Sequence, residues 1–176
     1  MLLALTLAIV VPQTGPDPRA AERGCIIQAL PPAQRIDLGE RFIAGEMKNA
    51  QLIAAGSAAK CAATWKWSAQ ARDWQIVHSA SFSAMSLLES QLPKLLNAKL
   101  LETLFGKLAP SDQYGLTLEG SAKLDADAYT AILRRVAALL ADKLVEDDIE
   151  IAGNWFIAYA QFLESDAHLK TLAGGR

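Results

Sequence analysis

The stretch from Cys61 to Leu92, CAATWKWSAQARDWQIVHSASFSAMSLLESQL, decides the fold class. It contains three of the four tryptophans, and its apolar and aromatic positions recur at steps of three and four residues. These positions are Trp67, Ala71, Trp74, His78, Phe82 and Met85. Residues at such steps share one face of an α-helix. The pattern therefore predicts a helix that ends before Pro93, and we expect the rest of the chain to pack around it.

The composition of the whole chain also favours helices. The chain has 176 residues and is 52% apolar, which is enough for one domain with a sizeable core. Alanine and leucine are abundant, and unbranched side chains lose little rotamer freedom in a helix. We expect a single all-α domain over residues 22–176, a bundle-like arrangement of about five to seven helices.

The charge balance excludes one large class of function. Lysine and arginine number 17 against 19 aspartate and glutamate residues, for a formal net charge of −2. Proteins that bind nucleic acid need a basic patch to neutralise phosphates, and this chain offers none in its sequence. We therefore expect no nucleic-acid partner.

The first residues suggest export. Leu2 to Val11 form an apolar run that Pro12 ends. The run is too short for a transmembrane helix, which needs about 20 residues, but its length is typical of a secretory signal. Ala20 and Ala21 supply small residues for cleavage, although no basic residue precedes the run. We expect a signal peptide over residues 1–21 and a periplasmic or secreted protein; a buried N-terminal strand or helix, or a misplaced start codon, are the alternatives.

The two cysteines, Cys25 and Cys61, follow this segment. In an oxidising compartment such a pair favours a disulfide, and we expect one between them. Two unpaired buried thiols are the alternative if the chain is not exported. Neither cysteine has a second metal-ligating residue at short spacing, so the sequence predicts no metal site there.

Glycines and prolines divide the remaining sequence into further helices. Gly45 and the pair Gly56-Ser57 predict helix breaks. Residues 106–120 contain three glycines and a proline and predict a long loop. The expected helices are 33–44, 46–55, one from Ala58, 94–105, one after Ser121 or Asp125 that reaches Leu144, and a last one that begins at Glu146 with an acidic first turn.

The last helix is apolar over a wide arc. Ile149, Gly153, Phe156, Ala160 and Leu163 form one stripe, and Ile151, Trp155, Tyr159 and Phe162 form a second. A helix of this kind is central in the domain or covered by a partner. We expect its apolar faces over residues 149–163 to be the surface through which the protein acts.

The aromatic face of the first helix is a candidate ligand site. Trp67, Trp74, His78 and Phe82 would line a cavity for an apolar or amphipathic small molecule, since aromatic side chains commonly line such cavities. The alternative is that these side chains are packed core, with His78 bonded to the backbone or to a serine. His168 follows Asp166 by two residues, a spacing that does not place two ligands on one helical face, so the sequence predicts no metal there.

No linear motif for catalysis or cofactor binding is present in the sequence. We therefore expect a non-catalytic protein without a cofactor, which acts by contact with another protein, an envelope component or a second copy of itself. A binding module for an apolar small molecule is the second hypothesis, and an enzyme whose site gathers His78 with a carboxylate or a thiol is the third.

Overall fold

The computed structural model describes residues 19–93 and 96–174, and its fold is all-α, as the sequence predicts. These residues form ten helices, against the five to seven expected. The additional elements are short, because α1, α2, α7 and α8 have only four to six residues each. The helices are α1 (Ala20–Arg23), α2 (Cys25–Ala29), α3 (Pro32–Ile43), α4 (Met47–Trp65), α5 (Ala69–Gln91), α6 (Ala98–Phe105), α7 (Pro110–Gly115), α8 (Leu118–Ser121), α9 (Ala126–Ala141) and α10 (Glu146–Gly174).

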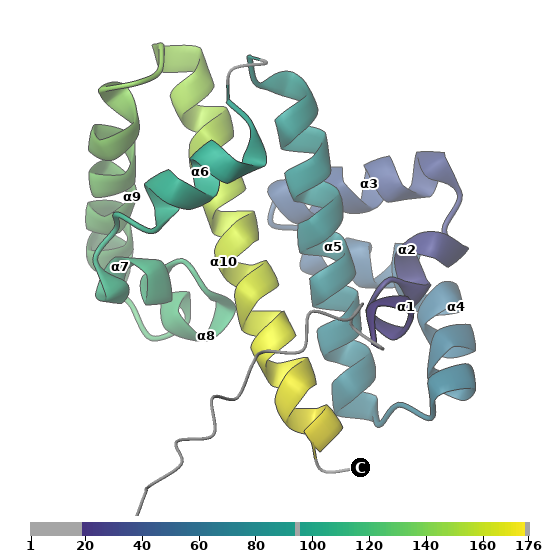
Figure 1. Ribbon diagram of the computed structural model, residues 1–176. Helices are drawn as coiled ribbons and strands as arrows, with labels where there is room; N and C mark the ends of the chain where they lie inside the picture. Colours follow the sequence, from purple (N-terminus) through teal and green to yellow (C-terminus); the bar gives the residue numbers. More distant parts are fainter. Residues whose placement is uncertain (1–18, 94–95, 175–176) are drawn as a thin grey trace, which may run out of the picture.

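Helices α5 and α10 form the centre of the molecule. They run side by side in opposite directions, with α1 to α4 on one side and α6 to α9 on the other (Figure 1). Trp155 and Phe156 of α10 are fully buried, and the Trp155 indole Nε1 donates a hydrogen bond of 2.9 Å to Glu89 Oε1 of α5. The wide apolar arc of α10 is thus explained first by its central position in its own domain.

The Trp-rich stretch is divided between two helices. Helix α4 continues through Gly56, where the sequence predicts a break, and ends at Trp65 because Lys66 adopts a left-handed conformation with φ of 54°. Ser68 then caps α5 by accepting a hydrogen bond from the Ala71 backbone N–H. Trp67 therefore lies before α5 and does not belong to the helical face on which the sequence places it.

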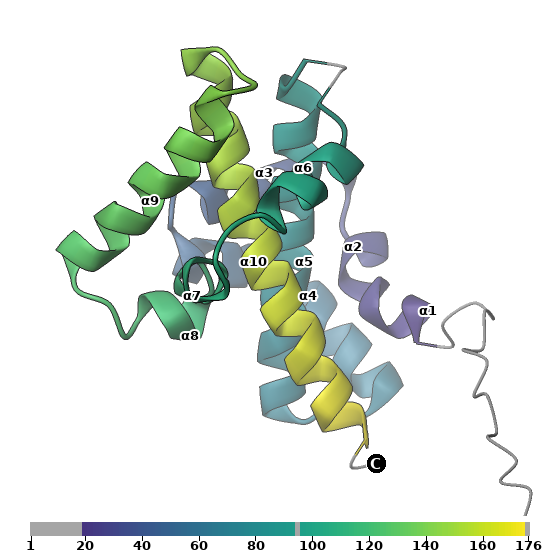
Figure 2. The same ribbon diagram turned by 60° about the vertical axis from the view of Figure 1, so that its left-hand side comes forward.

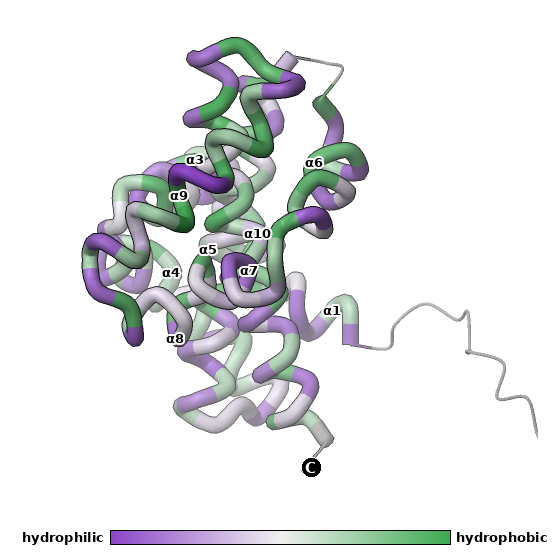
Figure 3. Tube along the Cα trace, turned by 90° about the vertical axis from the view of Figure 1, so that its left-hand side faces the viewer, coloured by the Kyte–Doolittle hydropathy of each residue, from purple (hydrophilic) through white to green (hydrophobic). Residues whose placement is uncertain are grey.

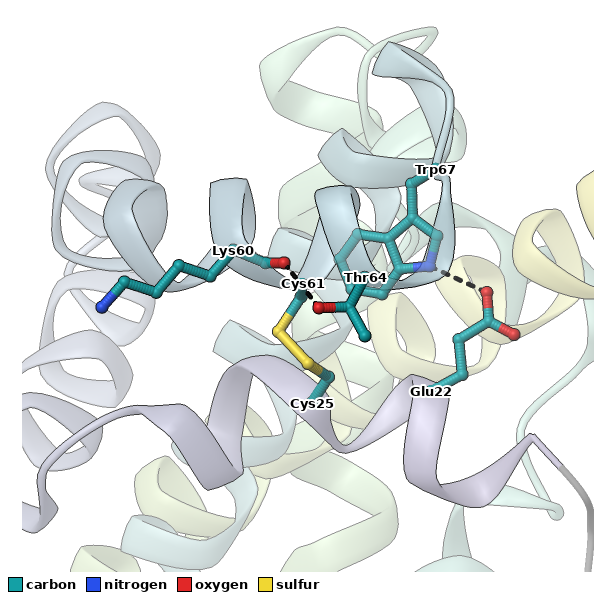
Figure 4. Close-up of a disulfide and its surroundings, with 6 residues drawn as sticks. All are labelled: Glu22, Cys25, Lys60, Cys61, Thr64 and Trp67. Atoms are coloured by element: carbon teal, nitrogen blue, oxygen red, sulfur yellow. Dashed lines mark hydrogen bonds between the residues drawn. A yellow bond between two sulfur atoms is a disulfide. The ribbon is translucent and has the colours of Figure 1, made fainter.

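Alanines explain why α4 is not interrupted. The buried face of α4 consists of small side chains at helical steps, and the sequence pattern does not make this face conspicuous. Each of its residues is at most 2% exposed: Ala50, Ala54, Ala58 and Cys61. The expected disulfide is present: Cys25 and Cys61 are joined, and it ties α2 to this face of α4 (Figure 4). The sequence separation of 36 residues corresponds to about 4 kcal/mol of stabilisation in the chain-entropy model.

The predicted loop over residues 106–120 is wrong, since this segment contains α7 and α8. Pro110 occupies the first turn of α7, and the Thr117 hydroxyl caps α8 by accepting from the Gly120 N–H. Two of the three glycines that suggest a loop lie where space is short: a Cβ on Gly115 would lie 2.3 Å from the end of the Ile132 side chain, and one on Gly120 would lie 1.8 Å from the Tyr114 carbonyl oxygen. Their role is therefore close packing and not chain reversal.

The later helices begin where the sequence indicates. Asp125 caps α9 through a hydrogen bond from the Ala128 N–H, and α10 opens with the acidic turn of Glu146, Asp147 and Asp148. Helix α6 starts at Ala98, four residues later than predicted, because Asn97 accepts from the Leu100 N–H and caps it. It is largely apolar (Figure 3), and its inner face covers α10 through Leu101, Leu104 and Phe105.

Two expectations concern the N-terminus and the membrane. Residues 1–18 of the predicted signal peptide lie outside the described residues, whereas Ala20 and Ala21 begin α1. Across the described part of the chain, no helix combines the length with the apolar character that crossing a bilayer would require.

Candidate functional site

The first two residues of the predicted ligand site, Trp67 and Trp74, face different neighbours. The Trp67 indole Nε1 donates a 2.8 Å hydrogen bond to Glu22 Oε1 of α1 (Figure 4). The Trp74 ring stacks flat on the ring of His168 in α10, with centroids 4.0 Å apart and an interplanar angle of 10°. One tryptophan therefore fixes α1, and the other fixes the end of α10.

His78 is buried between α5 and α10. Its ring stacks on Phe162 at 4.4 Å, and its Nδ1 lies 3.3 Å from the Ser165 hydroxyl oxygen. Burial lowers the pKa of His78 to about 4, with the carboxylate of Asp166 opposing this decrease and the guanidinium of Arg23 adding to it. His78 is thus a neutral imidazole at neutral pH, and Ser165 is the serine partner that the core interpretation calls for.

Phe82 is the most exposed member of the set. Its side chain is 45% exposed, and its ring centroid lies 6.4 Å from that of Phe162. The four predicted residues therefore have separate neighbours, and no one cavity among the described residues is lined by more than one of them. Ligand binding by this set stays a prediction.

A small cavity lies beside Trp67, between α1, α5 and the end of α10. Its volume is about 30 Å³, which suffices for water but not for an apolar ligand. The side-chain oxygen Oε1 of Gln75, a residue only 2% exposed, has no hydrogen-bond partner among the described residues and belongs to the same lining. Water bound there would satisfy this oxygen.

A groove between α3 and α5 opens beside Phe82. Its volume is about 350 Å³, and its apolar walls come from Ile27, Ile36, Phe82 and Leu87. Ile36 is 51% exposed at the edge. Arg35, Ser83, Ser86 and Ser90 provide the polar rim.

A second groove follows α10 where α9 crosses it at an angle (Figure 2). It has a volume of about 240 Å³ and is lined by Leu133, Val136 and Ala137 of α9 and by Ile149, Glu150, Gly153, Asn154 and Ile157 of α10. A Cβ on Gly153 would have no heavy atom within 4 Å outside its own helix, so the middle of the groove is open. This groove shares Ile149 and Gly153 with the apolar stripes that the sequence singles out over residues 149–163, whereas Phe156 and Ala160 of the same stripe are buried in the core.

A fourth feature is a group of possible metal ligands that the sequence reasoning missed. Glu119 of α8 and Glu164 and His168 of α10 bring three ligand atoms within 4.8 Å of one another. The available signal was the spacing of four residues between Glu164 and His168, which puts both on one helical face. Only the fold could add Glu119.

Comparison with known proteins found no matching family model, no matching curated protein and no matching solved structure.

Proposed function

We propose that this protein is a small exported helical protein that acts by contact, binding an apolar helical segment of another protein in the groove between α9 and α10, without catalysis. The open middle of this groove at Gly153 is the observation that carries the proposal. Ile149, Gly153 and Ile157 recur at steps of four on α10, which is the spacing at which one helix presents a face to another.

The charges near the groove indicate what kind of segment would fit. Glu150 is part of the lining, and the exposed carboxylates of Asp142, Glu146 and Asp147 lie at the same end of α9 and α10. Val145 is 69% exposed between them. A partner helix with an apolar face and flanking basic residues would match this surface in both hydrophobicity and charge.

Export is part of the proposal and is supported by the disulfide. Such bonds persist in oxidising compartments and are rare in reducing ones, so Cys25–Cys61 is expected of a periplasmic or secreted protein. Intact-mass measurement of protein from its native host would test this, because a retained N-terminus or two reduced thiols would contradict it.

The groove is tested by nuclear magnetic resonance titration of the full chain with a designed amphipathic helix of leucine and lysine. We expect saturable shifts of backbone amides over residues 133–137 and 149–157. The substitution Gly153→Leu should weaken binding by at least about tenfold because it fills the groove, which corresponds to about 1.4 kcal/mol.

Gly56→Leu is the matched control, since Gly56 is also a mid-helix glycine with open space around it. It should leave the affinity unchanged. A leucine and glutamate peptide of the same length should bind more weakly than the lysine peptide. Equal binding by wild type and Gly153→Leu, or shifts confined to another surface, would overturn the proposal, and sedimentation of the free protein would reveal a second copy as the occupant.

The groove beside Phe82 supports a second function, which is binding of an apolar small molecule. Its volume of about 350 Å³ falls within the usual range of ligand pockets, roughly 300–1,000 Å³. Titration with laurate distinguishes the two functions: shifts around Ile36 and Phe82 without shifts around Gly153 would favour the small molecule.

A further inference from the structure

One cluster of three side chains takes no part in the binding proposed for either groove. It consists of Glu119, Glu164 and His168. Glu164 and His168 lie one turn apart on α10, and Glu119 lies in the first turn of α8. His168 Nε2 is 3.1 Å from Glu119 Oε1, and the ligand atoms of the three side chains lie within 4.8 Å of one another. We propose that these residues bind a divalent transition-metal ion, with Zn²⁺ as the ion that fits best, and that the ion fastens α8 to α10.

Two of the three side chains are held in place before any ion binds. Both carboxylate oxygens of Glu164 accept backbone hydrogen bonds from α8, at 2.8 Å from the Leu118 N–H and 3.0 Å from the Glu119 N–H. Each oxygen keeps a further lone pair. The imidazole of His168 is fixed by its flat stacking on Trp74. Binding of an ion would therefore cost little conformational entropy, because these two ligands are already ordered.

The donor set selects the class of metal. One imidazole nitrogen with two carboxylate oxygens suits Zn²⁺ and its neighbours, whereas Ca²⁺ and Mg²⁺ take oxygen ligands. Tetrahedral Zn²⁺ with bonds of about 2.1 Å places its ligands about 3.4 Å apart. The 3.1 Å between His168 Nε2 and Glu119 Oε1 would widen slightly around such an ion, and the other ligand atoms, all within 4.8 Å of one another, would move closer together. The Glu119 side chain, which is 49% exposed, has room to make this adjustment.

The site is also accessible and carries the right charge. The His168 side chain is 34% exposed, so an ion can reach it from solvent. The two carboxylates together carry a charge of −2, which the nearby ammonium of Lys123 offsets only in part, so the site attracts an ion of charge +2. Three protein ligands leave a coordination position for water.

Isothermal titration of the tag-free, metal-stripped chain with Zn²⁺ tests the proposal. We expect saturable binding of one ion per chain. His168→Asn and Glu119→Gln should each weaken it by at least about tenfold, as loss of a ligand or its support does in known sites. Glu102→Gln, which changes a carboxylate of α6 outside the cluster, is the control and should bind like wild type.

Trp74 provides a second, optical measurement. Cu²⁺ bound at His168 should quench the fluorescence of the stacked Trp74 ring, because the two rings are 4.0 Å apart. Trp74→Phe should remove most of this quenching while Zn²⁺ still binds.

Wild-type affinity for Zn²⁺ in both His168→Asn and Glu119→Gln, or the lack of saturable binding in wild type, would overturn the proposal. Glu119 is exposed, so its variant tests the site even if His168→Asn does not fold.

Discussion

At Gly39 the contact between α3 and α5 is close, whereas at Gly153 the contact between α9 and α10 is open. A Cβ on Gly39 of α3 would lie 2.9 Å from the backbone carbon and oxygen of Ser83 in α5. A Cβ on Gly153 of α10 would meet nothing within 4 Å. The same residue type therefore brings two backbones together in one half of the molecule and leaves space in the other.

The helices on the two sides of the α5–α10 pair differ in how closely they pack. On the side of α1 to α4, small residues and the Cys25–Cys61 disulfide draw the helices together, and Ala50, Ala54 and Ala58 are fully buried. On the side of α6 to α9, short helices surround α10 and leave apolar side chains such as Leu133 and Ile157 only half-buried. Tight packing stabilises the fold, while incompletely covered apolar surface is typical of a place where another molecule binds.

The largest effect is expected at Gly39. Gly39→Leu places four carbon atoms where the α5 backbone lies, and backbone cannot move aside as a flexible side chain can. We expect the free energy of unfolding to fall by about 3 kcal/mol. Urea denaturation measures this, with Gly56→Leu as the control that should cost nothing. A stable Gly39→Leu protein would show that the α3–α5 contact is looser than described.

A smaller effect is expected from the pH dependence at the α5–α10 contact, which both halves share. The pKa of His78 is about 4 in the fold, against an ordinary value of 6.5 when unfolded. The unfolded chain therefore binds a proton that the folded chain excludes, and stability falls as the pH decreases through this window. Between pH 7 and pH 5 the loss attributable to His78 is about 2 kcal/mol.

The measurement is urea denaturation at both pH values for wild type and His78→Leu. The difference between the two pH values should shrink by about 2 kcal/mol in the variant, because the carboxylates titrate alike in both proteins. His168→Asn, which changes the other histidine, should keep most of the wild-type difference. An unchanged pH dependence in His78→Leu would mean that His78 reaches solvent and that the α5–α10 contact is not closed.

The elements of the fold that the sequence predicts are those whose signals are local. The cap at Asp125, the stop at Gly45 and the burial of Trp155 and Phe156 in α10 follow from local patterns, and the structure confirms them. The prediction of a loop over residues 106–120 is wrong because the space around Gly115 is taken up by Ile132 of α9, a residue distant in the sequence. That information is tertiary, and no window of sequence contains it.

The candidate sites show the same division. The period of three and four residues correctly relates Trp74, His78 and Phe82, but it cannot say that α10 supplies a partner for each of the first two. Glu164 and His168 are visible as a pair in the sequence, whereas Glu119 reaches them only because Glu164 caps α8. Sites assembled from distant segments therefore need the fold, even where half of their ligands are adjacent on one helix.

The smallest expected effect concerns the groove between α9 and α10. Gly153→Ala should raise the free energy of unfolding by about 1 kcal/mol, because alanine has the higher helix propensity and its methyl group meets no neighbour. For a chain of this length the midpoint of thermal unfolding should rise by about 2–4 °C, measured by circular dichroism. If α9 instead closes onto α10 in solution, the methyl group would clash and the midpoint would fall. A decrease would thus remove both the contrast with Gly39 and the groove on which the proposed binding depends.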